Sequence, residues 1–298
     1  MTDFTQQSPT GLMFHGYHMM VPSRHPIIEW NTPGKPGEQP YRESGLVLIS
    51  RALKLAGKKG VIIDIGANIG DSMIIIASNS GLPVHCLEAS DFFFAYLKEN
   101  INRHFPGQAT LEQAFVTSKD DESPMGLLHW GGTAKPISAP FTEHCGTLSI
   151  RQLLSKFDKV GLLKVDTDGY DQEIILGAFE TSPGQVPENK RFPIYFEFEI
   201  ASSEPDLVRK MCQRAIAFFR RMSELGYEIG FFWDDLGRCL GEFDIGQTNC
   251  VRNIINYMTH LRQRPVWGFD ICLIHREDPA LTRHMRSLVS QGVMVPYT

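Results

Sequence analysis

Residues 61–72, VIIDIGANIGDS, constrain the fold of this chain more than any other segment. Val61–Ile65 is a short β-branched run without polar alternation, which is typical of a strand buried on both faces of a parallel sheet. Gly66 ends this run, and an apolar segment that reads as a helix follows Gly70. A buried strand, a glycine turn and a helix predict the first unit of an α/β fold.

The same alternation of strands and helices continues along the chain. Further strands are expected at residues 84–88, 110–117, 161–166, 193–200, 228–233 and 269–275. Helices are expected between them, at residues 46–56, 90–101, 172–179, 203–225 and 251–261. This order predicts a doubly wound, mostly parallel sheet with right-handed crossovers.

The domain organisation follows from where this alternation begins. Residues 1–45 are rich in proline and glycine and are expected to form an N-terminal arm or lid. No linker or repeat interrupts residues 46–298, which are therefore expected to form a single domain. The connections at residues 118–146 and 234–268 are long for such a fold, and the first is a candidate substrate loop.

Composition excludes several classes of protein. The net charge of -5 gives no general field for polyanions, so no nucleic acid partner is expected. The six cysteines form no CxxC pair that would suggest zinc or a redox dithiol. The first residues lack a secretory pattern, and the longest apolar run, near residues 74–77, is too short to cross a membrane. A cytoplasmic protein is expected, with a homo-oligomer left open.

The glycine loop predicts the class of ligand. Glycines let a backbone approach a ligand, and a helix N-terminus offers free N–H groups to a negative group. A nucleotide-hydrolysing P-loop needs a Gly-Lys-Ser/Thr triplet, which the chain lacks. The dinucleotide fingerprint needs a glycine where Asn68 stands, and the acidic residues Asp64 and Asp71 are unfavourable for a diphosphate.

These residues favour a cationic ligand with an amino group, and S-adenosylmethionine is such a ligand. Its ammonium is expected near Asp64, and its carboxylate near the N–H groups of residues 68–72. Glu88, at the end of the next strand, is expected to accept both ribose hydroxyls, a role that acidic residues also play for NAD. The predicted cofactor-binding residues are Asp64, Gly66, Ala67, Asn68, Gly70, Asp71, Ser72, Glu88 and Ala89.

A second cluster of polar residues follows the predicted fourth strand. Lys164 and Asp166 lie on the same side of this strand because side chains alternate with a period of two. A lysine inside a central strand requires an ion pair, whereas Asp166 lies at the mouth of the expected crevice. Asp168 and Asp171 could instead cap the next helix.

The predicted fifth strand places two glutamates, Glu197 and Glu199, on one face. Asp166 and Glu197 could hold Mg²⁺ through their oxygens or divide acid and base roles, and their spacing selects neither. His129 and His144, in the long connection, are candidate bases.

At these residues the sequence resembles the FkbM-type family of S-adenosylmethionine-dependent methyltransferases. Residues 61–72 look like its first motif, and residues 147–149, 162–171 and 174–178 resemble its second conserved block. The resemblance spans roughly residues 60–200. Two of the family's usual glutamates are replaced by Asp168 and Asp171, and an aromatic residue by Asp71, so a catalytic role for Asp168 is doubtful.

The resemblance implies the Rossmann-like, seven-stranded class I methyltransferase fold. It also implies O-methylation of a hydroxyl on a sugar, polyketide or other natural product. Cofactor contacts are implied for Asp64, Gly66, Asn68, Gly70 and Glu88, and Asp166 is implied to border the methyl-transfer site.

We therefore expect a methyltransferase that acts on a small hydroxylated acceptor. The expected catalytic residues are Asp166 as the base, His144 or His129 assisting it, and Lys164 beside it. A divalent metal that polarises the hydroxyl is the alternative to a base. An NAD-dependent oxidoreductase and a non-catalytic methyltransferase-like binding module remain as alternatives.

Overall fold

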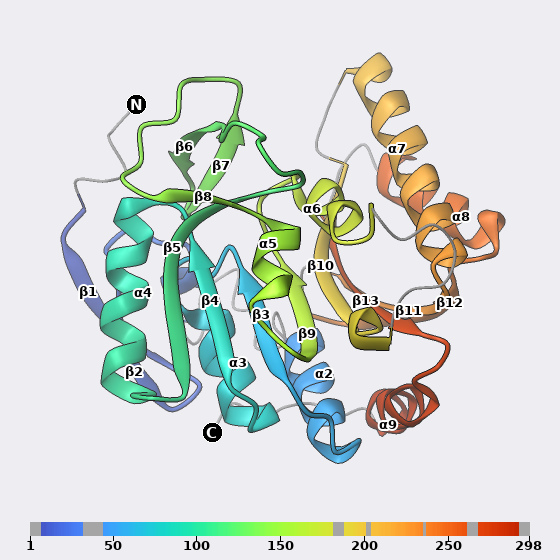
Figure 1. The fold of residues 1–298 in the computed structure, drawn as a ribbon, viewed down its shortest axis with the longest axis horizontal. Coiled ribbons are helices and arrows are strands. Elements are labelled where there is room, and N and C mark those ends of the chain that lie inside the picture. Colours follow the sequence, from blue (N-terminus) through green and yellow to red (C-terminus); the bar gives the residue numbers. More distant parts are fainter. Residues whose placement is uncertain are drawn as a thin grey trace.

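The computed structural model describes residues 7–31, 44–180, 188–200, 204–234, 237–260 and 268–291. A nine-stranded sheet runs through its centre (Figure 1). In spatial order its strands are β12 (Cys239–Asp244), β11 (Tyr227–Asp234), β13 (Gly268–His275), β10 (Ile194–Glu199), β9 (Val160–Val165), β3 (Val61–Ile65), β4 (Val84–Glu88), β5 (Ala109–Thr117) and β8 (Gly146–Ser149).

The direction of the strands confirms the predicted α/β class. From β10 to β8 every neighbouring pair is parallel, whereas β13 is antiparallel to both β10 and β11. The chain builds outward from β3 in both directions, so the order reverses between β3 and β9. In open α/β sheets this reversal creates a crevice at the carboxyl ends of the strands.

The seven strands expected from the sequence are all present, and β8 and β12 are added at the two edges of the sheet. β8 pairs with the end of β5 and β12 with β11. β12 lies within the connection at residues 234–268, and β8 begins at the end of the connection at residues 118–146. Both sequences are short and carry little apolar pattern. Their strand conformation therefore depends on a neighbouring strand rather than on their own residues.

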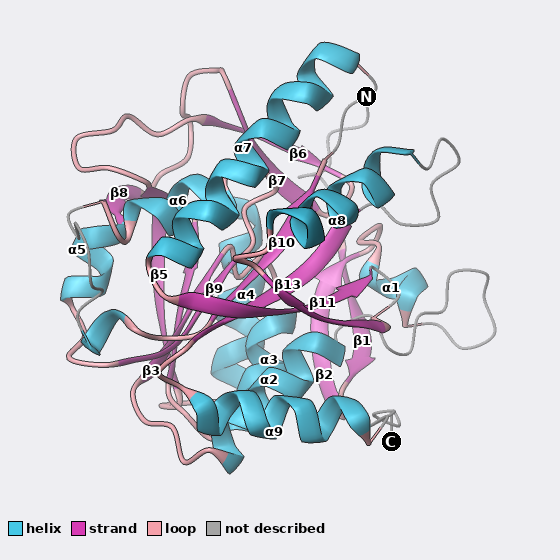
Figure 2. Cartoon of the chain, turned by 90° about the vertical axis from the view of Figure 1, so that its right-hand side faces the viewer, coloured by secondary structure: helices cyan, strands magenta, loops and turns pink. Residues whose placement is uncertain are grey.

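Helices cover both faces of the sheet, as Figure 2 shows for α2, α3 and α9 on one side and α6, α7 and α8 on the other. One face is covered by α2 (Ser44–Leu55), α3 (Asp71–Ser80), α4 (Asp91–His104) and α9 (Pro279–Ser290). The other face is covered by α5 (Ile150–Ser155), α6 (Asp171–Gly177), α7 (Pro205–Glu224) and α8 (Thr248–His260).

The sheet consequently has two apolar cores. Ile62 packs into one and its neighbour Ile63 into the other, and both are fully buried. Full burial of such a side chain contributes roughly 1.5–3 kcal/mol. These two covered faces explain why apolar residues point to both sides of β3.

The predicted N-terminal arm contains regular structure in its described part. β1 (Pro9–Phe14) and β2 (Tyr17–Pro22) form an antiparallel hairpin, followed by α1 (Ile27–Trp30). The buried side chain of Asn100 in α4 donates hydrogen bonds to the carbonyls of Met20 (2.9 Å) and Ile69 (2.8 Å). Asn100 thereby connects the arm to the glycine loop.

The first long connection also contains a hairpin, formed by β6 (Gly126–Trp130) and β7 (Thr133–Ile137). A short 3-10 helix, η2 (Glu188–Lys190), precedes β10. None of the helices in the described ranges combines the length and the apolar character needed to cross a membrane.

Candidate active site

A cavity of about 600 Å³ lies at the carboxyl ends of β3, β4, β9 and β10. It is at the position where the strand order reverses, which is the usual ligand position in open α/β sheets. Six of the nine predicted cofactor-binding residues line it, namely Gly66, Asn68, Asp71, Ser72, Glu88 and Ala89. Asp64, Ala67 and Gly70 are buried outside this lining.

The glycine loop lies directly against the loop that follows β9. Gly66 has a φ of +75°, and a Cβ at this position would lie 1.8 Å from the carbonyl oxygen of Asp166. The N–H groups of Gly66 and Ala67 both donate to the carbonyl of Leu87, at 2.9 and 3.0 Å. The ends of β3, β4 and β9 are therefore held at fixed positions around the cavity.

Glu88 is held at the cavity wall by two backbone N–H groups. Its two carboxylate oxygens accept from Asn68 (2.9 Å) and from Ser90 (2.8 Å). The side chain is buried, and this burial raises the pKa of Glu88 to about 7. Each oxygen keeps a second lone pair, so Glu88 can still accept hydrogen bonds from a ligand's hydroxyl groups.

Lys164 forms a buried ion pair with Asp64. Its Nζ lies 3.0 Å from Asp64 Oδ1 and 3.3 Å from Asp166 Oδ2, and Ser72 Oγ donates to Asp64 Oδ2 at 2.6 Å. Burial alone would lower the pKa of Lys164, but the carboxylates of Asp64 and Asp166 raise it well above its usual value. Lys164 therefore stays charged and cannot accept a proton.

Of the predicted catalytic residues, Asp166 and Lys164 both line the cavity. The side chain of Asp166 is 45% exposed, whereas that of Lys164 is 5% exposed. Of this ion pair, Asp166 is accordingly the residue that a bound molecule can reach, and Lys164 contacts it from the buried side.

The two aspartates that follow have different environments. Asp171 accepts from the backbone N–H groups of Thr167 (3.2 Å) and Gly169 (3.1 Å), and its burial raises its pKa to about 8. Asp168 lines the cavity in a left-handed conformation with a φ of +53° and accepts a hydrogen bond from Thr133 Oγ1. Burial raises the pKa of Asp168 to about 6. Asp171 thus organises the loop that precedes α6, but it does not cap the helix, because the N-cap residue is Tyr170 and no side chain makes a capping hydrogen bond there.

Acidic side chains gather on the wall formed by β9, β10 and β13. Glu197 lines the cavity and lies directly opposite Asp270 of β13, and its neighbour in β10 on the same face is Glu199. Burial, and then the charges of Asp166, Glu199 and Asp270, raise the pKa of Glu197 well above its usual value. Sequence reasoning missed Asp270, although an aspartate inside an apolar strand was a usable signal.

The metal alternative finds no support in this geometry. Within the described ranges, no group of three or more His, Cys, Asp or Glu side chains is arranged to hold a metal ion. Asp166 and Glu197, the predicted metal ligands, both line the cavity but belong to no such group.

The β6–β7 hairpin closes one side of the cavity. The carbonyl of Gly132 accepts from Asn68 Nδ2 at 2.8 Å and lies 3.0 Å from His25 Nε2. Trp130, at the tip, lines the cavity but is 74% exposed. The predicted substrate loop therefore reaches the site, together with His25 from the N-terminal arm, which the sequence did not single out.

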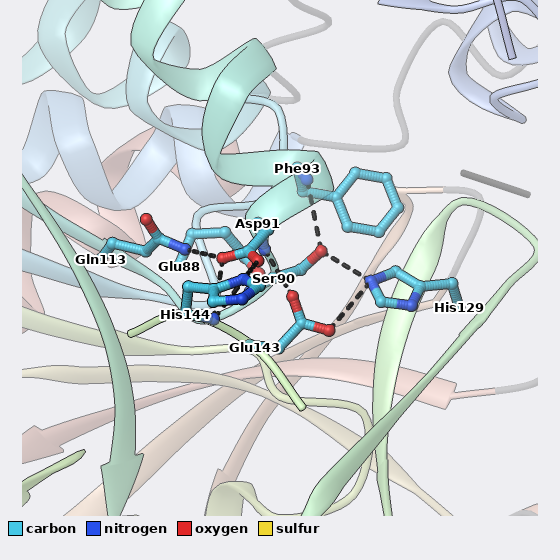
Figure 3. A network of polar contacts seen from close by, with 8 residues as sticks. All are labelled: Glu88, Ser90, Asp91, Phe93, Gln113, His129, Glu143 and His144. Carbon is cyan, nitrogen blue, oxygen red and sulfur yellow. Dashed lines mark hydrogen bonds and ion pairs between the residues drawn. The ribbon is translucent and has the colours of Figure 1, made fainter. Parts of the chain in front are cut away.

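The two histidines of the long connection lie elsewhere, at the start of α4 (Figure 3). His144 Nδ1 is 2.6 Å from Asp91 Oδ2, the hydrogen bond to Asp91 raises its pKa, and its side chain is 90% exposed. His129 Nε2 is 2.6 Å from Ser90 Oγ, which also accepts from Phe93 N. Neither histidine lines the cavity, so neither is brought to Asp166.

No protein-family model matches this chain, and no curated protein matches it. Solved structures with a similar arrangement include the precorrin-6y C5,15-methyltransferase of Geobacter metallireducens, which is 13% identical over 78% of this chain and 86% of that chain, with a TM-score of 0.37. An O-methyltransferase of Bacillus cereus in complex with SAH is 13% identical over 78% of this chain and 80% of that chain, with a TM-score of 0.41.

Proposed function

We propose that this chain is an S-adenosylmethionine-dependent methyltransferase that methylates a hydroxyl of a small acceptor such as a sugar, a polyketide or another natural product. The observation that carries the proposal is the position of Glu88. It lines the cavity at the end of β4 and accepts a hydrogen bond from the glycine loop, at Asn68. The resemblance of residues 61–72 and 162–171 to FkbM-type methyltransferases supports the same activity.

The polar atoms of the cavity fit this cofactor. Asn68 Oδ1 is buried and has no hydrogen-bond partner among the described residues, so a ligand donor would satisfy it. Glu88 has spare acceptor capacity for two ribose hydroxyls. Asp71, Asp166 and Asp168 also line the cavity, and their charge favours a sulfonium and an ammonium over the pyrophosphate of NAD.

The chain's own residues would position the acceptor and take its proton. When bound, S-adenosylmethionine would supply an electrophilic methyl group whose bond to sulfur breaks with the electron pair remaining on sulfur. Asp166 accepts the proton that the acceptor hydroxyl loses as its oxygen bonds to the methyl carbon. Lys164 orients Asp166 from the buried side, at 3.3 Å. Holding the reacting atoms in line supplies most of the remaining acceleration.

Isothermal titration with S-adenosylhomocysteine, and with NAD in parallel, tests the cofactor class. We expect S-adenosylhomocysteine to bind and NAD not to bind. Binding of NAD alone, or of neither molecule, would refute the proposal.

Asp166→Asn tests the proposed base once an acceptor is found. A general base contributes about 10²–10⁴-fold to a rate, so kcat should fall by at least about 100-fold. The affinity for S-adenosylhomocysteine should fall far less than kcat, because Asn keeps the size of the side chain and Asp71 and Asp168 keep their charges beside the cavity. Unchanged turnover would remove Asp166 from the mechanism.

A further inference from the structure

We propose that the acceptor carries a protonated amine beside its reacting group, and that Glu197 binds this amine. The inference deepens the proposed function and rests on it, because it assumes that the acceptor occupies the part of the cavity formed by β9, β10 and β13. It narrows the acceptor from any hydroxylated molecule to a hydroxylated cation, such as an amino sugar or a phenolic amine.

The first observation is that Glu197 lies on the cavity wall and its carboxylate has no hydrogen-bond or ion-pair partner among the described residues. In the backbone register Glu197 is opposite Asp270 of β13. On its other side Phe196 is opposite Val165 of β9, so Glu197 is next to Asp166, which follows that strand. Acidic residues therefore lie on both sides of Glu197 across the sheet, Asp270 on β13 and Asp166 at the end of β9.

The second observation is that the described cations near this wall already serve other carboxylates. Lys164 Nζ is shared between Asp64 and Asp166, at 3.0 and 3.3 Å. Lys135 Nζ lies 3.8 Å from Glu199 Oε2. A largely buried carboxylate is stable in its ionised form only when it is paired or hydrogen-bonded. Because these cations pair with other carboxylates, a bound ammonium would supply the positive charge that Glu197 lacks.

The third observation distinguishes an organic cation from a metal ion. The described acidic residues do not converge into a group of three or more that could hold a metal. An alkylammonium needs only one or two carboxylates, and it gains further stabilisation from aromatic faces. Phe269 and Trp130 line the same cavity and provide apolar surface for the carbon skeleton of such a ligand.

The raised pKa of Glu197 adds a measurable consequence. Burial and the neighbouring carboxylates raise it well above its usual value, which favours the protonated form of Glu197 when the cavity is empty of cations. A bound ammonium favours the ionised form and displaces that proton. Amine binding is therefore coupled to proton release, which a neutral acceptor would not cause.

The test compares matched pairs of probes on the intact protein saturated with S-adenosylhomocysteine. Tyramine is compared with 4-ethylphenol, and glucosamine with glucose, by isothermal titration in buffers of different ionisation enthalpy. We expect the amine of at least one pair to bind at least about tenfold more tightly than its neutral counterpart, as for a charge-assisted hydrogen bond, and to release protons.

Three variants assign the effect to Glu197. Glu197→Gln should abolish the preference for amines and reduce proton release, whereas Glu197→Asp keeps the charge and should retain part of the preference. Glu228→Gln is the matched control, because Glu228 is exposed and lies outside the cavity lining. It should leave both the preference and the proton release unchanged. Thermal denaturation and S-adenosylhomocysteine affinity show that each variant is folded.

The outcomes separate this inference from the proposed function. Equal binding of both members of both pairs, tighter binding of the neutral members, or no amine binding while S-adenosylhomocysteine binds would overturn the inference alone. A preference that survives in Glu197→Gln would overturn the assignment to Glu197. Failure of the wild-type protein to bind S-adenosylhomocysteine would instead overturn the proposed function.

Discussion

Lys164 and Asp64 are direct cross-strand partners in β9 and β3, and their side chains form an ion pair of 3.0 Å beneath the cavity. Asp64 is completely buried and Lys164 is 4% exposed. The pair therefore lies where neither charge is solvated, and each residue depends on the other.

Lys164→Met should destabilise the fold by about 3–5 kcal/mol, because removing one partner leaves a buried charge without compensation. Urea unfolding measures this change. Lys159→Met, at an exposed lysine next to the same strand, should change the free energy of unfolding by less than about 0.5 kcal/mol. Adding Asp64→Asn to Lys164→Met should recover part of the loss. A loss no larger than that of Lys159→Met would show that the pair does not stabilise the fold.

Gly66→Ala should abolish binding of S-adenosylhomocysteine in titration calorimetry. The new Cβ would lie 1.8 Å from the carbonyl of Asp166, so the glycine loop and the loop after β9 must separate. Gly57→Ala is the control, since Gly57 also has a positive φ, +62°, but has no atom within 4 Å of the added Cβ. It should cost about 1–2 kcal/mol of stability and leave binding unchanged. Normal binding by Gly66→Ala would contradict the close packing of the two loops.

Much of the fold was predictable from the sequence because the patterns that specify it lie within short, continuous segments. The apolar residues on both sides of β3 and the alternation of strands and helices specify a buried parallel sheet whatever the distant contacts are. β8 was not predictable in this way, because its four residues become a strand only beside β5.

The candidate site was predictable only in part, because some of its contacts join residues from distant segments of the chain. The glycine loop, Glu88 and Asp166 carry a local pattern, and they meet because strand ends of a parallel sheet share one edge. An ion pair for Lys164 was predictable, but the register that pairs it with Asp64 is a property of two distant segments, so the identity of its partner emerged only from the fold. His25 reaches the site from the N-terminal arm through Gly132, and no local signal marks it.

Asp171→Asn should change how stability depends on pH. In the unfolded chain this carboxyl ionises near its ordinary pKa of 3.8, whereas in the folded protein burial raises the pKa to about 8. Between these values the folded state binds the additional proton, so this residue's contribution to stability is complete below about pH 4 and is lost as the pH rises through 8.

Denaturant unfolding from pH 5 to pH 9 checks this expectation. Relative to the wild type, Asp171→Asn should gain stability as the pH rises, by about 5 kcal/mol at most. Asp158→Asn, at an exposed aspartate, should not show this trend. A constant difference between wild type and Asp171→Asn across the range would refute the raised pKa.

His144→Ala should change kcat by less than about twofold, well below the contribution of a general base. The reason is position, because His144 is bound to Asp91 at the start of α4 and does not line the cavity. Steady-state kinetics with the identified acceptor would measure this, alongside Asp166→Asn. A loss of 100-fold or more in His144→Ala would show that this histidine moves to the site during turnover.

Asn68→Asp should loosen the β6–β7 hairpin and weaken S-adenosylhomocysteine binding by about tenfold. Asn68 Nδ2 donates to the carbonyl of Gly132 at 2.8 Å, and a carboxylate there would instead repel that carbonyl and the nearby Glu88. Amide hydrogen exchange of residues 126–137 should accelerate. Asn79→Asp is the control, because Asn79 Nδ2 also donates to a carbonyl, that of Ile75 at 2.8 Å, but outside the cavity. Equal exchange in the two variants would show that Asn68 does not hold the hairpin over the cavity.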